Sequence, residues 1–239
     1  MADRFNLENP QLATTEDRDK SRPRDFLSRF LEGGQKDPDF MTQERILAMT
    51  TANMFAGSDT TAITLRAIFW FLLQNPKCMQ RLMEELKQVK QSDNGLLSWS
   101  QVRHLPYLCA VIKEALRCHP AAGLTLERVV PPTGICVNGH FLPGGTIVGC
   151  SPWTVHLNES IFGHKPDEFR PERWLDEPSH RVRDMENTLF TFGAGSRTCI
   201  GKNISLLEMH KLVPAVLRKF EVCVPHGTNY FQFWLPRGI

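Results

Sequence analysis

Apolar residues recur at helical spacing through the first half of the chain, and shorter runs of different period follow them. The longest helical pattern begins at Thr42, a candidate N-cap, and stops at Gln74, before a proline. At about 1.5 Å per residue, one continuous helix of this length would span about 50 Å and cross a whole domain. The same spacing predicts a helix over 77–90 and another from about Tyr107 to Cys118.

The period changes after residue 125. Three segments rich in β-branched residues are typical of strands: "LERVV", "GICVNGHFL" and "GTIVGCSPWTVHL". In the second segment, Asn138-Gly139 predicts a two-residue hairpin turn. Residues 166–184, rich in proline and arginine, are predicted to be irregular. A last helix should run from near Gly201 to about Phe220 with a kink at Pro214, and a small hairpin should close the chain. The predicted fold class is therefore mainly α with a small β-sheet region (α+β).

Polarity divides the chain into two unequal parts. Residues 1–40 are charge-rich and predict a partly irregular N-terminal segment with one short amphipathic helix around 25–31. Residues 41–239 hold the long helical patterns, the strands and a glycine-rich loop, and form the predicted main portion. The polar start predicts no signal peptide, and the best apolar run, 62–73, is too short for a membrane span and contains Arg66.

Composition excludes several classes of function. Lys and Arg number 28 against 26 Asp and Glu, a net charge of +2, so no overall charge predicts a nucleic-acid partner. Seven cysteines, an odd number without a CxxC pair, argue against a disulfide framework or a structural zinc site, and favour a reducing compartment. The eight histidines form no HxxxH or HExxH pattern, so they are expected to be surface or hydrogen-bonded residues.

One cysteine stands in an unusual setting, between a glycine-rich loop and a helix start. In "FGAGSRTCIG", Cys199 is followed by a predicted helix N-terminus, whose unpaired N–H groups and positive dipole end favour a thiolate. The amides after Cys199 are expected to donate to the sulfur. A thiolate here could act as a nucleophile, a redox switch or a metal ligand. His210 is eleven residues away, so the loop itself supplies no base for a nucleophile.

The spacing of this loop resembles the haem-ligand loop of the cytochrome P-450 family, in which the cysteine is the axial thiolate of the haem iron. The resemblance is to a fungal-type microsomal member. It implies that Cys199 binds the iron of haem b, and that electrons arrive from NADPH through a reductase. The loop residues expected to contact the haem beside Cys199 are Phe192, Gly195, Arg197 and Gly201.

Other motifs of the family occur in the family's order. By resemblance, "AGSDTT" at 56–61 places Thr60 to support oxygen activation and Asp59 to relay protons, with 56–57 leaving room for oxygen and substrate. A threonine-rich exposed helix face is the alternative. Glu114 and Arg117 of "KEALRCHP" share one helix face, and with Arg173 of "FRPERW" the resemblance implies a buried network that locks the Cys199 loop. The alternative for the pair is a surface contact.

The resemblance also assigns binding surfaces. Arg128 and Arg197 are the candidates for holding the haem propionates, although Arg128 could be an ordinary strand-edge charge beside Glu127. An acidic flavoprotein reductase is expected on basic residues near Cys199, namely Arg181, Arg183, Lys202, Lys211, Arg218 and Lys219. Walls of a lipophilic substrate pocket are expected at 53–55, 121–125 and 230–233, although core packing would explain these apolar positions equally well.

Taken together, the resemblance implies a haem-thiolate monooxygenase that inserts one atom of dioxygen into a small lipophilic substrate, in secondary metabolism or detoxification. Family members are longer, so the chain is expected to be their C-terminal half, without the N-terminal half and its membrane anchor. Full-length relatives would be anchored in the endoplasmic reticulum facing the cytosol, and this chain would be cytosolic. Two alternatives remain: a catalytically inactive haem-binding fragment, and a haem-thiolate isomerase or dehydratase, which the Asp59-Thr60 pair disfavours.

Overall fold

The computed structural model describes residues 25–90, 96–223 and 232–234. These residues belong to two compact units, which divide between Ala56 and Gly57, inside one long helix. The described chain is mainly helical with three small antiparallel sheets, as the sequence predicted. None of its helices is both long and apolar enough to cross a membrane.

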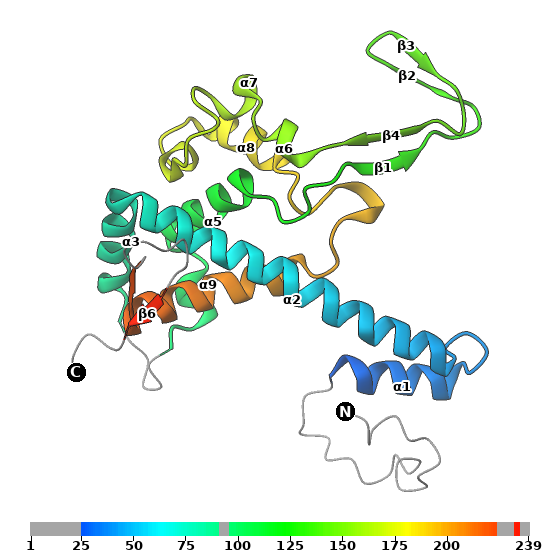
Figure 1. Ribbon diagram of the computed structural model, residues 1–239, viewed down its shortest axis with the longest axis horizontal. Helices are drawn as coiled ribbons and strands as arrows, with labels where there is room; N and C mark the ends of the chain where they lie inside the picture. The colour runs from blue at the N-terminus through cyan, green and yellow to red at the C-terminus, as the bar shows by residue number, and fades with distance from the viewer. Residues whose placement is uncertain (1–24, 91–95, 224–231, 235–239) are drawn as a thin grey trace, which may run out of the picture. The chain divides into compact units, whose positions relative to one another are not determined.

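The long helix is α2, which runs unbroken from Gln43 to Gln74 and confirms the prediction of a single helix over this region (Figure 1). Thr42 precedes it, and its Oγ1 accepts a hydrogen bond from the backbone N–H of Arg45 at 3.4 Å. The next helix begins at Pro76, because a proline is tolerated in the first turn of a helix but not in its interior. The "AGSDTT" motif therefore lies within regular α-helix.

Helix α1, Phe26–Lys36, is longer than the sequence predicted. Asp25 caps its N-terminus by accepting from the N–H of Ser28 at 2.8 Å. The helix continues through the glycine pair instead of ending before it. A Cβ added at Gly34 would lie only 3.0 Å from the Ile46 side chain, so the glycine permits close packing of α1 on the start of α2.

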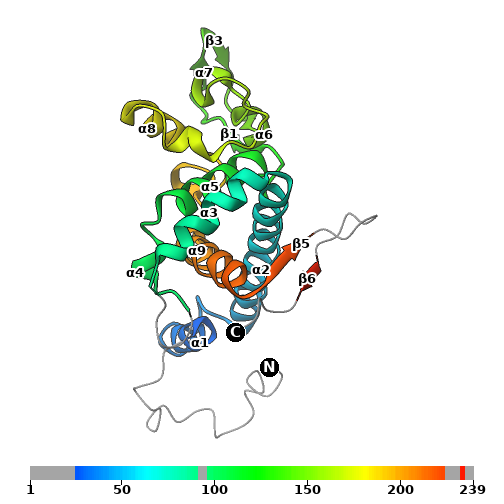
Figure 2. The same cartoon turned by 90° about the vertical axis from the view of Figure 1, so that its left-hand side faces the viewer.

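The core of the second unit lies where four helices meet: the C-terminal half of α2, α3 (Pro76–Gln88), α5 (Pro106–Cys118) and α9 (Lys202–Lys219) (Figure 2). The fully buried members of this cluster are Ile68, Leu72, Leu82, Leu86, Val102, Leu108, Val111, Ala115 and Val213. Glu85 of α3 supplies the N-terminal cap of α5, since its carboxylate accepts from the backbone N–H groups of Tyr107 and Leu108. The core therefore fixes α5 and α9, the two helices on which the candidate site depends.

The segment predicted to be irregular, 166–184, contains two helices that the sequence analysis missed. A 3₁₀ helix, η4, covers Pro171–Trp174, and α8 covers Ser179–Thr188. α8 is almost entirely polar and buries only Met185 over its length, so it lacks the apolar periodicity by which a helix is detected. Three further single-turn helices were also not predicted: α4 (Trp99–Val102), α6 (Pro152–Val155) and α7 (Glu159–Phe162).

Three two-stranded sheets complete the fold. Strand β1 (Leu126–Val129) pairs with β4 (Ile147–Cys150), and β2 (Ile135–Val137) with β3 (His140–Leu142), in the long arm seen in Figure 1. The predicted turn is confirmed: Asn138 and Gly139 join β2 to β3 with φ angles of 48° and 81°. Strand β5 (Glu221–Cys223) pairs with β6 (Gln232–Trp234), in agreement with the predicted closing hairpin.

Candidate functional site

Cys199 lies in a tight loop that leads into α9. The backbone N–H of Cys199 donates to the carbonyl oxygen of Phe192 at 2.8 Å, which closes the loop at its base. The Phe192 side chain is half-buried against the helical core, with the Lys202 ammonium 5.7 Å from its ring centroid. The Cys199 side chain is exposed. The loop is thus anchored through Phe192 and presents the thiol at the surface of the described chain.

Two glycines make the turn possible. Gly193 and Gly195 have φ angles of 69° and 67°, in the left-handed region where an L side chain is strained. Gly201 stands at the N-cap of α9, and a Cβ added there would lie 3.9 Å from the Cys199 sulfur. The positive end of the α9 dipole therefore lies beside the thiol. The amides of Lys202 and Ser205 donate to the backbone oxygens of Cys199 and Gly201.

Glu114, fully buried on α5, is the centre of a polar network. Its two oxygens accept from the Arg117 guanidinium at 2.8 and 2.9 Å, and one of them accepts from Arg173 Nε at 2.9 Å. The Trp174 indole N–H and the backbone N–H of Arg170 donate to the same carboxylate at 2.8 and 2.9 Å. Burial raises the pKa of Glu114, but the Arg117 and then the Arg173 contacts outweigh it, so that the pKa lies below its usual range.

The two arginines use their remaining N–H groups on backbone carbonyls. Both have completely buried side chains. Their acceptors belong to the stretch between α6 and η4, where little regular structure holds the backbone: His156, Pro166 and Glu168 for Arg117, and Phe162, Lys165 and Glu168 for Arg173. The charge of Glu114 thus fixes two cations, and the cations fix this stretch of backbone.

Two contacts join α5 to the beginning of the Cys199 loop. The Thr191 hydroxyl donates to the Leu116 carbonyl at 2.7 Å. The His156 ring lies between the Arg117 carbonyl, 2.9 Å from Nδ1, and the Phe190 backbone N–H, 2.8 Å from Nε2. Burial lowers the pKa of His156 to about 4, so the ring is neutral at neutral pH. The helix that carries Glu114 therefore also holds the loop that carries Cys199.

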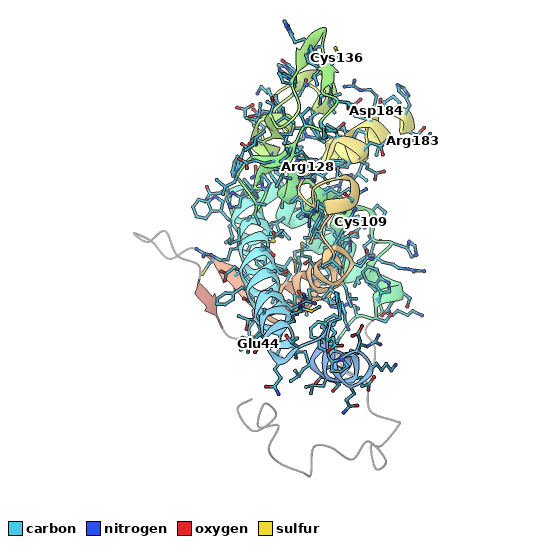
Figure 3. The ribbon with its side chains drawn as sticks, turned by 90° about the vertical axis from the view of Figure 1, so that its right-hand side faces the viewer. Glu44, Cys109, Arg128, Cys136, Arg183 and Asp184 are labelled. Carbon is cyan, nitrogen blue, oxygen red and sulfur yellow. The ribbon has the colours of Figure 1, made fainter. Side chains whose placement is uncertain are left out.

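Arg128 on β1 reaches the same loop. Its guanidinium is 3.4 Å from the carbonyl of Ala194, and a Cβ at Gly193 would lie 3.7 Å from the Leu126 side chain on the same strand. Arg128 also donates to the backbone carbonyl of Glu127, the residue before it on the strand. Figure 3 labels Arg128 close to the segment leading into α9. Two exposed cations, Arg128 and Arg197, thus belong to or adjoin the Cys199 loop.

The threonines of "AGSDTT" point in different directions. Thr61 is buried, and its Oγ1 lies 3.1 Å from Ser205 Oγ on α9. Asp59 and Thr60 are exposed on the described chain, and Thr60 accepts a hydrogen bond at its carbonyl from the Thr64 hydroxyl. Two of the three polar groups in this motif are therefore exposed, and the buried one, Thr61, has a hydrogen-bonding partner. A Cβ at Gly57 would meet nothing within 4 Å, so the helix is open on that side.

The basic residues expected near Cys199 do not gather in one place. Lys202 follows the loop, whereas Arg218 and Lys219 end α9, about 25 Å along the helix axis. Arg218 donates to the Val89 carbonyl and Arg181 to carbonyls of α7, so both have structural contacts.

Of the expected walls of the substrate pocket, 121–125 forms a largely exposed stretch after α5. Residues 53–55 belong to the first unit, and the side chains of 230–233 lie outside the described residues.

The surroundings of Cys199 suit one kind of metal centre. Within the described residues no three metal-ligating side chains gather, so this part of the chain offers no cage for a bare ion. A haem iron already has four porphyrin nitrogens, and one thiolate completes its protein side. His210, the nearest histidine in sequence, is occupied elsewhere: its Nδ1 contacts the Leu206 carbonyl and its Nε2 lies 3.6 Å from Cys109 Sγ. An exposed cysteine with adjoining cations therefore fits a haem better than a hydrolytic dyad.

Sequence reasoning missed several residues of the site. Trp174 could have been suspected, because it directly follows Arg173 in "FRPERW" and a buried indole needs an acceptor. Thr61 and Ser205 could not, since they are 144 positions apart and neither stands in a distinctive local pattern. His156 was placed among the surface or hydrogen-bonded histidines, and no neighbouring residue signals that its ring is 1% exposed.

Comparison with known proteins assigns the family. The Cytochrome P450 family profile matches residues 6–231. The chain is 52% identical over 201 residues to a cytochrome P450 monooxygenase of Aspergillus terreus, a match covering 83% of this chain and 41% of that protein. It is 43% identical over 233 residues to one from Aspergillus flavus, covering 94% and 45%. Pisatin demethylase of Fusarium vanettenii is 47% identical over 175 residues, covering 73% and 33%.

The chain belongs to the cytochrome P450 family, and its relatives are fungal monooxygenases, as the sequence predicted. Members of this family hold a haem through a cysteine thiolate. The chain spans less than half the length of these relatives.

Proposed function

We propose that this chain is the haem-binding portion of a monooxygenase that inserts one atom of dioxygen into a C–H bond of a small lipophilic substrate. Cys199 would hold the iron of haem b through its sulfur, and NADPH would supply the electrons through a flavoprotein reductase. The single observation that carries the proposal is the exposed Cys199 thiol in a glycine loop that α5, β1 and α9 hold in place. When bound, the haem supplies the oxygen-activating chemistry.

The role of the loop residues follows from their contacts. Phe192 accepts from the Cys199 amide and anchors the loop in the core, while Gly195 allows the turn and Gly201 leaves the sulfur accessible at the start of α9. The α9 dipole stabilises the anionic sulfur. Arg128 and Arg197 would each donate to a propionate carboxylate, a contact for which a guanidinium is suited.

The network of Glu114, Arg117 and Arg173 has a structural role in this proposal. It does not touch the reacting groups. It keeps η4 and the C-terminal end of α5 in one arrangement, and α5 in turn accepts the hydrogen bonds of the Cys199 loop. A buried ion pair of this kind contributes little net stability, but removing one member leaves uncompensated charge. The network is therefore expected to specify the loop's geometry rather than to raise stability.

Asp59 and Thr60 are the proposed proton-handling residues. Their exposure allows both side chains to reach a ligand bound beside α2, and Thr61 ties this turn of α2 to α9 six residues after Cys199. The Thr60 hydroxyl would hold water or dioxygen by hydrogen bonding, and Asp59 would exchange protons with solvent. Because Gly57 has open space around it, substrate can approach α2 one turn before these residues.

A proposed reductase site follows from the spread of basic residues. Of the basic residues expected to bind the reductase, Lys202 is the closest in sequence to the ligand loop. The docking surface should therefore centre on Lys202 rather than on the far end of α9.

The substrate is proposed to be small, organic and lipophilic. One relative is named pisatin demethylase, and oxidative demethylation is one reaction that oxygen insertion into a C–H bond brings about.

Haem titration of the purified chain tests this proposal. We expect saturable uptake of one haem per chain by the wild-type protein and by Cys150→Ser, which removes an exposed cysteine of β4. Cys199→Ser should change the spectrum of the bound haem and weaken its retention. If both cysteine variants behave alike, Cys199 is not the ligand.

A second assay measures NADPH-dependent substrate oxidation with a flavoprotein reductase. It separates a monooxygenase from an inactive haem-binding fragment or an isomerase, because neither of these consumes NADPH.

A further inference from the structure

His156 makes two hydrogen bonds that determine its protonation state. The Phe190 backbone N–H can only donate, so the Nε2 atom that faces it at 2.8 Å carries the lone pair. The proton of the neutral ring is therefore on Nδ1, which donates to the Arg117 carbonyl at 2.9 Å. His156 is only 1% exposed, so water cannot replace either of these two hydrogen-bonding partners. It links a carbonyl of α5 to an amide of the Cys199 loop in a single tautomer.

The position of Phe190 gives this link its importance. The Phe190 carbonyl accepts from the Gly193 amide at 2.9 Å, and this turn brings Phe192 to the place where its carbonyl meets the Cys199 amide. Between His156 and the sulfur-bearing residue there is thus a short, continuous series of hydrogen bonds. Thr191 adds a parallel contact to the Leu116 carbonyl, the residue before Arg117 on α5. The last turn of α5 holds the first residues of the loop at two adjacent points.

We propose that His156 is a positioning residue for Cys199: as a neutral bridge between the Arg117 carbonyl and the Phe190 amide, it determines where the loop begins and therefore where the thiolate stands. The effect of His156 on the position of the loop does not depend on the proposed function. Only the identity of the group that Cys199 binds rests on it. His156 touches neither the cofactor site nor substrate, so its effect is exerted through Phe190.

The chemistry of the ring explains why an apolar side chain cannot replace it. A residue of similar volume would still fill the space against the Phe162 ring, whose centroid is 5.8 Å away. It would leave a carbonyl of α5 and the Phe190 amide buried without partners. Protonation would also break the bridge, because Nε2–H and the Phe190 N–H would then both be donors. Of the charged groups facing the ring, Arg117 disfavours the protonated form and Glu114 favours it, and burial keeps the ring neutral down to mildly acidic pH.

Two substitutions separate bridging from simple packing. In His156→Gln, the amide oxygen can occupy the place of Nε2 and accept from Phe190. In His156→Asn, the shorter amide can occupy the place of Nδ1 and donate to Arg117, but it cannot reach Phe190. The matched control is His164→Gln, at a histidine whose side chain is 77% exposed. The first readout is amide hydrogen exchange at Phe190 in the cofactor-free 239-residue chain, and the second is the carbon-monoxide difference spectrum of the haem-loaded chain.

We expect the Gln variant and the control to keep the protection of Phe190 near that of the wild type. The Asn variant should lose about tenfold, as expected for one net hydrogen bond. With haem, the Gln variant should keep the thiolate band and the Asn variant should lose part of it. Equal protection in the Gln and Asn variants would overturn the inference.

The remaining outcomes separate this inference from the proposed function. If the wild-type chain lacks the thiolate band while the exchange difference persists, the proposed function fails and His156 still positions the loop. If the band is present but identical in the Gln and Asn variants, the inference fails and the proposed function stands. Should the Asn variant not fold, an acid series on the wild type and the Gln variant decides. Protection at Phe190 should fall toward pH 4 in the wild type only, and a parallel fall in both proteins would overturn the inference.

Discussion

The hydroxyl of Thr61 on α2 lies 3.1 Å from the hydroxyl of Ser205 on α9, although the two residues are 144 positions apart in the chain. The contact is partly buried, and it joins the turn of α2 that follows Asp59 and Thr60 to the first turns of the helix that follows Cys199. It links the helix that carries the proposed oxygen-handling residues to the helix that follows the proposed ligand loop. The relative position of these two functional segments therefore depends on two hydroxyl groups and the packing around them.

A double-mutant cycle tests whether this contact couples the helices. Thr61→Val preserves shape and removes one hydroxyl, and Ser205→Ala removes the other. Each single change should lower the free energy of unfolding by about 1 kcal/mol, and the double mutant should cost less than the sum, because both remove the same hydrogen bond. Urea unfolding measures all four proteins. Effects that add to within about 0.3 kcal/mol would show that the hydroxyls do not interact.

Glu114→Gln tests the buried network. The amide keeps the size of the side chain but removes the charge that balances Arg117 and Arg173, both completely buried. We expect a loss of about 3–5 kcal/mol in the free energy of unfolding, or failure to fold. The control is Glu186→Gln, which breaks an exposed pair with Lys113 and should cost no more than about 1 kcal/mol. Similar small losses of unfolding free energy in both variants would show that the buried network does not need the charge of Glu114.

The pH dependence of stability should carry the signature of His156. Its pKa in the folded chain is about 4, below the usual 6.5, so the unfolded chain binds more protons between these values. Its contribution is complete above pH 6.5 and is lost as pH falls toward 4, by up to about 3 kcal/mol. The lowered pKa of Glu114 adds a loss only at more acidic pH, below its unfolded value. Denaturant unfolding of His156→Gln from pH 7 to 4 should give a shallower slope than the wild type, and identical slopes would contradict the assignment.

Two glycines of the ligand loop should respond differently to alanine. Gly195 has a φ angle of 67° and open space around its missing Cβ, so Gly195→Ala should cost about 1–2 kcal/mol through backbone strain alone. Gly201 lies outside the left-handed region, and its added Cβ would make ordinary contact with the Cys199 sulfur at 3.9 Å. Gly201→Ala should therefore cost less, about 0.5 kcal/mol, because Ala is only less favourable than Gly at an N-cap. Thermal melting compares the two, and equal losses would refute the distinction.

The sequence predicted those elements whose signals are local. The apolar periodicity of α2, α3 and α5 and the Asn138-Gly139 turn were confirmed because spacing and turn chemistry act within a few residues. The polar helix α8 was missed, because it buries a single residue and is held by tertiary contacts such as those of Arg181. The single-turn helices around 152–162 are too short to show a period.

The candidate site divides in the same way. The resemblance of local motifs to those of the family indicated Cys199, Glu114, Arg117 and Arg173. The partners that complete the site come from distant segments: Trp174 on Glu114, His156 on Phe190, and Ser205 on Thr61. Their roles depend on which surfaces the fold brings together, and no single-sequence pattern encodes that. The same limit explains the basic residues, which are near Cys199 in sequence but lie as far away as the other end of α9.

The measurement that tests the central claim most directly is the carbon-monoxide difference spectrum of the reduced, haem-loaded chain, run beside Cys199→Ser. A thiolate opposite carbon monoxide moves the main absorption band of ferrous haem far to the red of its position with a neutral ligand. We predict the red-shifted band in the wild type and in Cys150→Ser, and its absence in Cys199→Ser. A wild-type chain that binds haem without this band, or a Cys199→Ser variant that keeps it, would contradict the assignment of Cys199 as the haem ligand.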